Sequence, residues 1–189
     1  MKKHRAVKTV AAISKISSVL VFMVAAVCSL FAQDGVTVKN TFQNWTVATD
    51  KDAMSDEVTQ VILNQGTASL NNVTVDASPN FTIMCTKKRI SAGADIEGVA
   101  YIPYRFVSLD GSAEITYRFD TEKQAIGFWH VGSGNLFRVP GNPRSFIKKM
   151  EDAQRLRIAY STVHGTQVIM SFELAGVREA LQSTECKID

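Results

Sequence analysis

Residues 113–131 constrain the fold most, because they alternate apolar and polar side chains over two consecutive arms. The alternating apolar residues of the first arm are Ile115, Tyr117 and Phe119. A period of two is typical of a strand with one buried face. Residues 121–123 form a polar break, and residues 125–131 resume an apolar run that includes Phe128-Trp129. The pattern predicts an antiparallel β-hairpin with Arg118 and Asp120 on its outer face.

A second turn signal precedes this hairpin. Residues 98–109 form another extended run, which ends at the dipeptide Asp110-Gly111. Asp-Gly between two extended runs favours a two-residue hairpin turn, and the turn length fixes the pairing register. We therefore expect residues 98–109 to pair with the first arm, with Tyr104 opposite Tyr117.

Short extended runs fill most of the remaining chain, and two helical patterns interrupt them. The expected strands lie within residues 36–50, 58–63, 67–75, 81–85, 136–139, 156–160 and 168–172, and residues 91–95 are expected to form a turn. Asn142 and Pro143 are a typical helix start; a second amphipathic helix is expected near residues 174–181. The fold class is mainly β: an antiparallel β-sandwich-like, or α+β, single domain with two short helices.

The N-terminus has the pattern of a bacterial secretory signal. Basic residues precede an apolar run over residues 19–32, and no acidic residue occurs before Asp34. The run is shorter than the roughly 20 residues that span a bilayer. We expect residues 1–32 to be removed after Ala32, leaving residues 33–189 as one β-rich periplasmic or secreted domain without a stable membrane span. The alternatives are a membrane anchor and lipidation at Cys28.

Removal of this signal changes the charge of the chain. Five of the 21 Lys and Arg residues lie in it, so 16 remain against 18 acidic residues. The basic character of the full sequence therefore gives no support for nucleic-acid binding.

Two cysteines remain in the expected mature chain, Cys85 and Cys186. In an oxidising compartment such a pair is expected to form one disulfide. The alternatives are two free buried thiols or a metal site formed by the two cysteines with His130 and His164, the histidines of the expected mature chain.

No motif of a known catalytic centre occurs in the sequence, and we expect neither catalytic residues nor a cofactor or metal. Arg118 and Asp120 lie two apart on one strand face, where they are expected to form a surface or half-buried ion pair. The alternative is that the two clamp a neighbouring strand or a partner's carboxylate. Trp45 is expected to pack in the core or at a sheet edge, with a ligand platform as the alternative. Trp129 is likewise a candidate for partner binding or packing. The alternative function, a small secreted hydrolase or inhibitor, would use Asp120 with His130.

The chain resembles the VasI/TagO family of periplasmic, type VI secretion-associated proteins. The matching segments, in order, are Trp45-Thr-Val with residues 50–56, Phe81-Thr-Ile-Met-Cys85, Ile115-Thr-Tyr-Arg-Phe-Asp120, Phe128-Trp129, residues 145–156, and Phe172-Glu-Leu-Ala-Gly176 with Cys186. The chain departs from the family at its end, where Lys187 follows the last cysteine in place of an aromatic residue. The resemblance implies a non-enzymatic accessory or binding protein of the cell envelope, with an envelope or secretion-apparatus protein as its partner.

Overall fold

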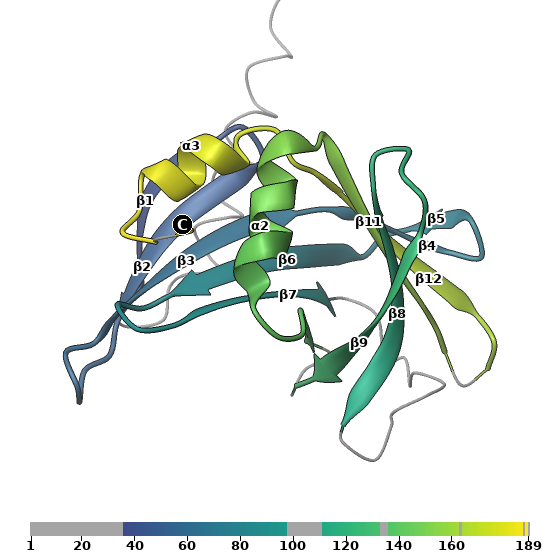
Figure 1. Ribbon diagram of the computed structural model, residues 1–189, viewed down its shortest axis with the longest axis horizontal. Coiled ribbons are helices and arrows are strands. Elements are labelled where there is room, and N and C mark those ends of the chain that lie inside the picture. Colours follow the sequence, from purple (N-terminus) through teal and green to yellow (C-terminus); the bar gives the residue numbers. More distant parts are fainter. Residues whose placement is uncertain (1–35, 98–110, 133–135, 163, 187, 189) are drawn as a thin grey trace, which may run out of the picture.

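One antiparallel sheet organises residues 36–97, 111–132, 136–162, 164–186 and 188, which the computed structural model describes (Figure 1). Its strands are β1 (Val36–Phe42), β2 (Trp45–Lys51), β3 (Val58–Gln65), β4 (Thr67–Leu70), β5 (Val73–Val75), β6 (Ser78–Cys85), β7 (Ile90–Glu97), β8 (Ser112–Phe119), β9 (Ala125–Val131), β10 (Phe137–Arg138), β11 (Arg155–Ser161) and β12 (Gln167–Glu173). The two described helices are α2 (Pro143–Asp152) and α3 (Val177–Gln182). The prediction of a mainly β, antiparallel single domain with two short helices is confirmed.

The sheet curls until its two halves face each other. The hydrogen-bonded order is β1-β2-β3-β6-β7-β10-β9-β8-β11-β12-β4-β5. β3 and β4 are consecutive in the chain and are separated by Gly66. β3 pairs with β2 near one edge of the sheet, whereas β4 pairs with β12 near the other edge. The chain around Gly66 therefore brings the two ends of the sheet together. Phe81 of β6 and Phe172 of β12 pack edge to face across the interior, with ring centroids 5.7 Å apart. The two layers of the predicted sandwich are thus parts of one continuous sheet.

The hairpin predicted over residues 113–131 is present as β8 and β9. The alternate residues Ala113, Ile115 and Phe119 are buried, as expected. On its other edge β8 pairs with β11, so Tyr117 lies between Ala125 and Ile158. The predicted pairing of Tyr104 with Tyr117 is therefore wrong; residues 98–109 themselves lie outside the described part of the chain.

The turn expected at residues 91–95 is also wrong, because these residues belong to β7. Small side chains there weaken the sequence signal for a strand, but they suit a crowded position. Ala92 and Ala94 are buried. A Cβ at Gly93 would come within 2.6 Å of the Phe137 carbonyl oxygen on β10. The strand needs small residues in order to sit between its neighbours.

Both helices lie on the sheet and bury one side. Asn142 caps α2 as expected, since its Oδ1 accepts a hydrogen bond from the Arg144 N–H at 3.1 Å. Ile147 and Met150 of α2 are buried, and α3 lies over β1 and β2 in Figure 1. Within the described ranges, no helix has the length and apolar character needed to cross a membrane.

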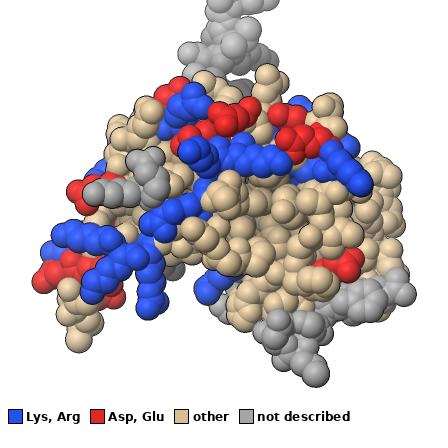
Figure 2. Space-filling view, viewed as in Figure 1, with Lys and Arg blue, Asp and Glu red and all other residues tan. Residues whose placement is uncertain are grey.

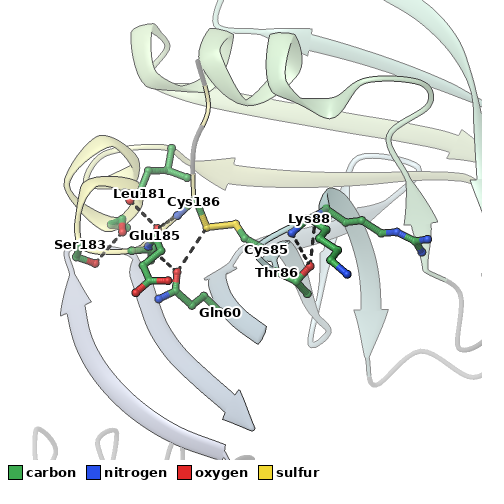
Figure 3. Close-up of a disulfide and its surroundings, with 11 residues drawn as sticks. Gln60, Cys85, Thr86, Lys88, Leu181, Ser183, Glu185 and Cys186 are labelled. Carbon is green, nitrogen blue, oxygen red and sulfur yellow. Dashed lines mark hydrogen bonds between the residues drawn. A yellow bond between two sulfur atoms is a disulfide. The ribbon is translucent and has the colours of Figure 1, made fainter. Parts of the chain in front are cut away.

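A disulfide between Cys85 and Cys186 joins the end of β6 to the chain beyond α3, which confirms the predicted pairing over the free thiols and the metal site. The two Cα atoms are 5.7 Å apart across a sequence separation of 101. Gln60 Oε1 accepts a hydrogen bond from the Glu185 N–H at 2.7 Å and lies 3.9 Å from Cys186 Sγ. Figure 3 shows Gln60 and Glu185 on one side of the disulfide and Lys88 on the other. The C-terminal segment is therefore held against both β3 and β6.

Candidate functional site

An open cleft of about 360 Å³ lies where α2 crosses β8 and β9. Four aromatic side chains form its floor and walls: Tyr117, Phe119, Trp129 and Phe146. We call this feature the aromatic cleft. Trp129 and Phe119 are buried behind it, whereas Tyr117 and Phe146 are half-buried and face the opening. Ligand pockets of this size typically combine apolar walls with a few polar groups.

Phe146 is the centre of the aromatic packing. Its ring centroid lies 5.1 Å from that of Phe119, 5.4 Å from Tyr117 and 5.6 Å from Trp129. Edge-on and tilted pairs at such distances add about 0.5–1.5 kcal/mol each beyond simple burial. The rings that a ligand would touch are therefore held rigidly before any ligand arrives.

Polar and charged side chains surround the opening. Lys149 Nζ lies 2.5 Å from Glu122 Oε2 and 5.0 Å from the centroid of the Phe119 ring. Both partners of this ion pair are about half exposed, so the pair contributes little to stability. Arg118, Ser145 and Asn142 complete the rim. An apolar floor inside a polar rim is the usual anatomy of a protein-binding patch.

Asp120 does not pair with Arg118. It follows the last residue of β8 with a positive φ of 45°. Its carboxylate accepts hydrogen bonds from the backbone N–H groups of Gln154, at 3.0 Å, and Arg155, at 2.7 Å. The predicted ion pair is wrong, because the carboxylate is used to fix the chain between α2 and β11 beside β8.

Arg118 instead lies directly opposite Arg157 of β11. Both arginines are half-buried, and neither makes an ion pair with a described residue. Like charges opposite each other weaken a strand pair. Arg118 also lines the aromatic cleft, where it could meet a partner's carboxylate.

Both tryptophans lie in the core. Trp45 is fully buried, and its Nε1 donates a hydrogen bond to the Leu174 carbonyl oxygen at 3.3 Å. The expectation that Trp45 packs in the core is confirmed. Trp129 is also fully buried and supports Tyr117 from behind, with ring centroids 5.8 Å apart.

Asp120 and His130 do not converge, which removes the pair on which the hydrolase hypothesis depended. His130 lies opposite Ser112, at the beginning of β8, whereas Asp120 follows its end. Eight residues of extended strand separate these positions by roughly 27 Å. The described residues contain no group of three or more His, Cys, Asp or Glu side chains placed to hold a metal ion.

In the sequence, Phe146, Ile147 and Met150 follow Pro143 with the spacing of an apolar helical stripe, a pattern that predicts packing and not a site. The buried residues of α2 are Pro143, Ile147 and Met150, spaced as one helix face. Phe146 lies beside that buried face, and its large apolar side chain at this position is the sequence feature that indicates an aromatic ring at the edge of the core. Tyr117 gave no such signal, because its exposure depends on how α2 crosses the hairpin.

Comparisons with known proteins support the fold. The chain matches no protein-family model, and no curated protein matches it. It is similar to the crystal structure of invasion associated protein b from Bartonella henselae, with 13% sequence identity and a TM-score of 0.50. The similarity covers 78% of this chain and 95% of that chain. At this identity the similarity shows a shared fold alone.

Proposed function

We propose that this protein is a non-enzymatic binding or accessory protein of the bacterial cell envelope, and that it holds its partner in the aromatic cleft. The observation that carries the proposal is the half-exposed pair Tyr117 and Phe146, set in an open cleft of about 360 Å³. Aromatic side chains held rigidly in this way lose little entropy on binding, and they are enriched at protein interfaces.

The chemistry of the rim indicates the kind of partner. Arg118, Lys123 and Lys149 line the cleft with one carboxylate, Glu122. A partner segment with an apolar or aromatic anchor and a neighbouring acidic side chain would complement this arrangement. The resemblance to the VasI/TagO family adds an envelope or secretion-apparatus protein as the class of partner.

The location in the envelope rests on the secretory signal expected in residues 1–32 and on the confirmed disulfide, which is typical of oxidising compartments. Expression in a bacterial host should yield a periplasmic protein that begins at Gln33. N-terminal sequencing of the periplasmic fraction checks this. A cytoplasmic protein that retains Met1, or one anchored through Cys28, would count against the proposal.

The binding function can be tested by blocking the cleft without disturbing its aromatic packing. Ser145 is exposed on the cleft rim, and Ser161 is exposed at the far end of β11, outside the cleft. Affinity isolation from solubilised envelopes should recover a defined component with the native protein and with Ser161→Arg, but not with Ser145→Arg. Equal recovery with the two variants would show that the partner binds elsewhere.

A further inference from the structure

A second site lies on the other side of the first turn of α2, at the end of the sheet where β6 turns into β7. Two cavities of about 560 and 570 Å³ occur there, and both are lined by Thr86, Lys88, Arg89, Ile90 and Arg144. We call them together the basic cavity. It is distinct from the aromatic cleft, because Asn142 is the only described residue that lines both.

The basic cavity has a strong excess of positive charge. Arg138 lines the first of the two cavities and Lys87 the second, so five cationic side chains border the combined space. Among the described residues that line the two cavities, Glu185 is the only one with a carboxylate. Figure 2 shows several Lys and Arg side chains, with some Asp and Glu side chains beside them, at the lower left of the molecule.

Most of these cations have no anionic partner among the residues that the structure describes. Ion pairs are formed by Lys51, Lys149, Arg155 and Arg178, which do not line the cavity. Lys87, Lys88, Arg89 and Arg138 make no ion pair with a residue that the structure describes. The first turn of α2, which forms part of the wall, contains no acidic residue. Clustered like charges repel one another, and an anion that enters the cavity relieves this repulsion.

The turn that presents these residues is held in place. Thr86 Oγ1 accepts hydrogen bonds from the backbone N–H groups of Lys88 and Arg89, at 3.3 and 3.2 Å, and the Thr86 N–H donates to the Arg89 carbonyl oxygen at 2.9 Å. The disulfide at Cys85 ties the same end of β6 to the C-terminal segment. Binding therefore requires little ordering of the backbone, which lowers its entropic cost.

The remaining lining of the cavity indicates what accompanies the anionic group. Thr82 and Ser91 offer hydroxyl groups, while Met84, Ile90 and Leu136 offer apolar surface. Met84 is 43% exposed, which leaves its side chain free to contact a ligand. Hydroxyl and apolar contacts next to several cations suit an uncharged sugar or glyceryl unit that carries a strongly anionic group.

We propose that the basic cavity binds a phosphate ester, with Lys88 and Arg89 as its principal contacts. A phosphate group offers several acceptor oxygens to converging Lys and Arg side chains, and Arg can contact it through two parallel hydrogen bonds. The ligand chemistry is shared by soluble sugar or glycerol phosphates and by the headgroups of anionic envelope lipids. This inference is independent of the partner proposed for the aromatic cleft.

The test compares two charge-matched double variants of the purified protein. K88E/R89E reverses two cations of the basic cavity; K39E/K148E reverses two exposed lysines that line neither cavity. The probes are glycerol 3-phosphate, followed by calorimetry, and vesicles of phosphatidylglycerol in phosphatidylcholine, followed by sedimentation with pure phosphatidylcholine vesicles as the blank.

We expect saturable binding of at least one probe, weakened about tenfold or more by K88E/R89E, where a charged contact is replaced by a repulsive one. K39E/K148E should weaken it by less than about twofold, because exposed charges that do not line the cavity are screened by water and salt. R138E changes another wall of the cavity and leaves the turn after β6 intact. This variant should also weaken binding, which would show that the effect does not come from a change in the turn. Binding of glycerol 3-phosphate identifies a soluble ligand, and binding of vesicles alone identifies a lipid headgroup. The proposal is overturned if neither probe binds, or if the two double variants lose affinity equally.

Discussion

Asp120 makes no ion pair with Arg118 but holds the neighbouring strand β11, which was the alternative role predicted for the pair. Its carboxylate accepts the N–H groups of Gln154 and Arg155, while its own N–H donates to the Arg155 carbonyl oxygen at 2.9 Å. Asp and Asn tolerate the positive φ found here better than other residues that have a Cβ. The residue thus fixes where β11 begins relative to the end of β8.

Replacing Asp120 by Ala should lower the free energy of unfolding by about 2 kcal/mol, because two backbone N–H groups lose their acceptor and Ala is strained at this φ. Asp120→Asn keeps one acceptor oxygen and the tolerance for positive φ, so its cost should be under about 1 kcal/mol. Urea unfolding of the purified variants measures both. The exposed Glu114 on β8 supplies the control, since Glu114→Ala should change stability by less than about 0.5 kcal/mol. An Asp120→Ala variant as stable as Glu114→Ala would disprove that Asp120 holds β11.

Asp52 gives the structure a local dependence on acid. The backbone N–H of Ser55, the N–H of Met54 and the Ser55 hydroxyl all donate to its carboxylate, which lowers its pKa below the ordinary value of 3.8. A lowered pKa means that the folded turn favours the charged form. The stabilising contribution is therefore fully present above pH 3.8 and is lost as the pH falls through the lower, folded-state pKa.

This dependence should appear in the amide resonances of Met54 and Ser55. Their NMR shifts should titrate with a midpoint below 3.8 in the native protein, and that titration should be absent from Asp52→Asn. A midpoint at or above 3.8 in the native protein would show that the hydrogen bonds do not hold the carboxylate.

Among the elements, those with a clear local period were predictable and those defined by crowding were not. β8, β11 and β12 alternate apolar and polar residues, and each occurs where the alternation places it. The Ala-Gly-Ala centre of β7 has no such period, because small side chains are required where β7 packs closely against its neighbours. The start of α2 was also predictable, because Asn142 caps the helix with its side chain and Pro143 suits the first helical position.

The features that make the candidate site depend on contacts between distant segments. The path of α2 across the hairpin makes the aromatic cleft, and the bend at Gly66 closes the sheet. Neither is encoded by a periodicity within one element. The separation of Asp120 from His130 likewise follows from the pairing of β8 with β9: Asp120 follows the end of β8, whereas His130 pairs with Ser112 at its beginning. Their nearness in sequence does not reveal this separation.

Gly66 supplies a test of the closure. A Cβ at this position would overlap the Ser171 carbonyl oxygen and the Phe172 ring of β12. Gly66→Ala should therefore lower the free energy of unfolding by about 1–3 kcal/mol through overpacking. At Gly132 the nearest atom to an added Cβ is 3.6 Å away, an ordinary contact. Gly132→Ala should consequently be close to neutral in the same urea experiment, and equal effects at the two glycines would contradict the close approach of β12.

At the scale of the whole molecule, the disulfide is the strongest single constraint on the unfolded chain. It closes a loop with a sequence separation of 101. On the chain-entropy account, a loop of this length adds about 4–5 kcal/mol to stability. The double variant Cys85→Ala/Cys186→Ala should lose approximately that amount in urea unfolding. A loss below about 1 kcal/mol would mean that the unfolded chain is already compact without the crosslink.

The oxidised state itself can be checked on protein from the periplasm. Neither Cys85 nor Cys186 should react with a thiol probe until a reductant is added. Labelling of both residues without reductant would contradict the disulfide.

We propose that a rigid aromatic cleft between α2 and the β8–β9 hairpin holds a partner in the envelope. Site-specific photo-crosslinking in intact cells tests it most directly, with the photoreactive residue placed at Ser145 on the cleft rim or at Ser161 outside it. We predict a discrete crosslinked species from position 145 that is absent from position 161 and that disappears when Tyr117, at the cleft opening, is replaced by Ser. The same species from both positions, or none from position 145, would contradict the account.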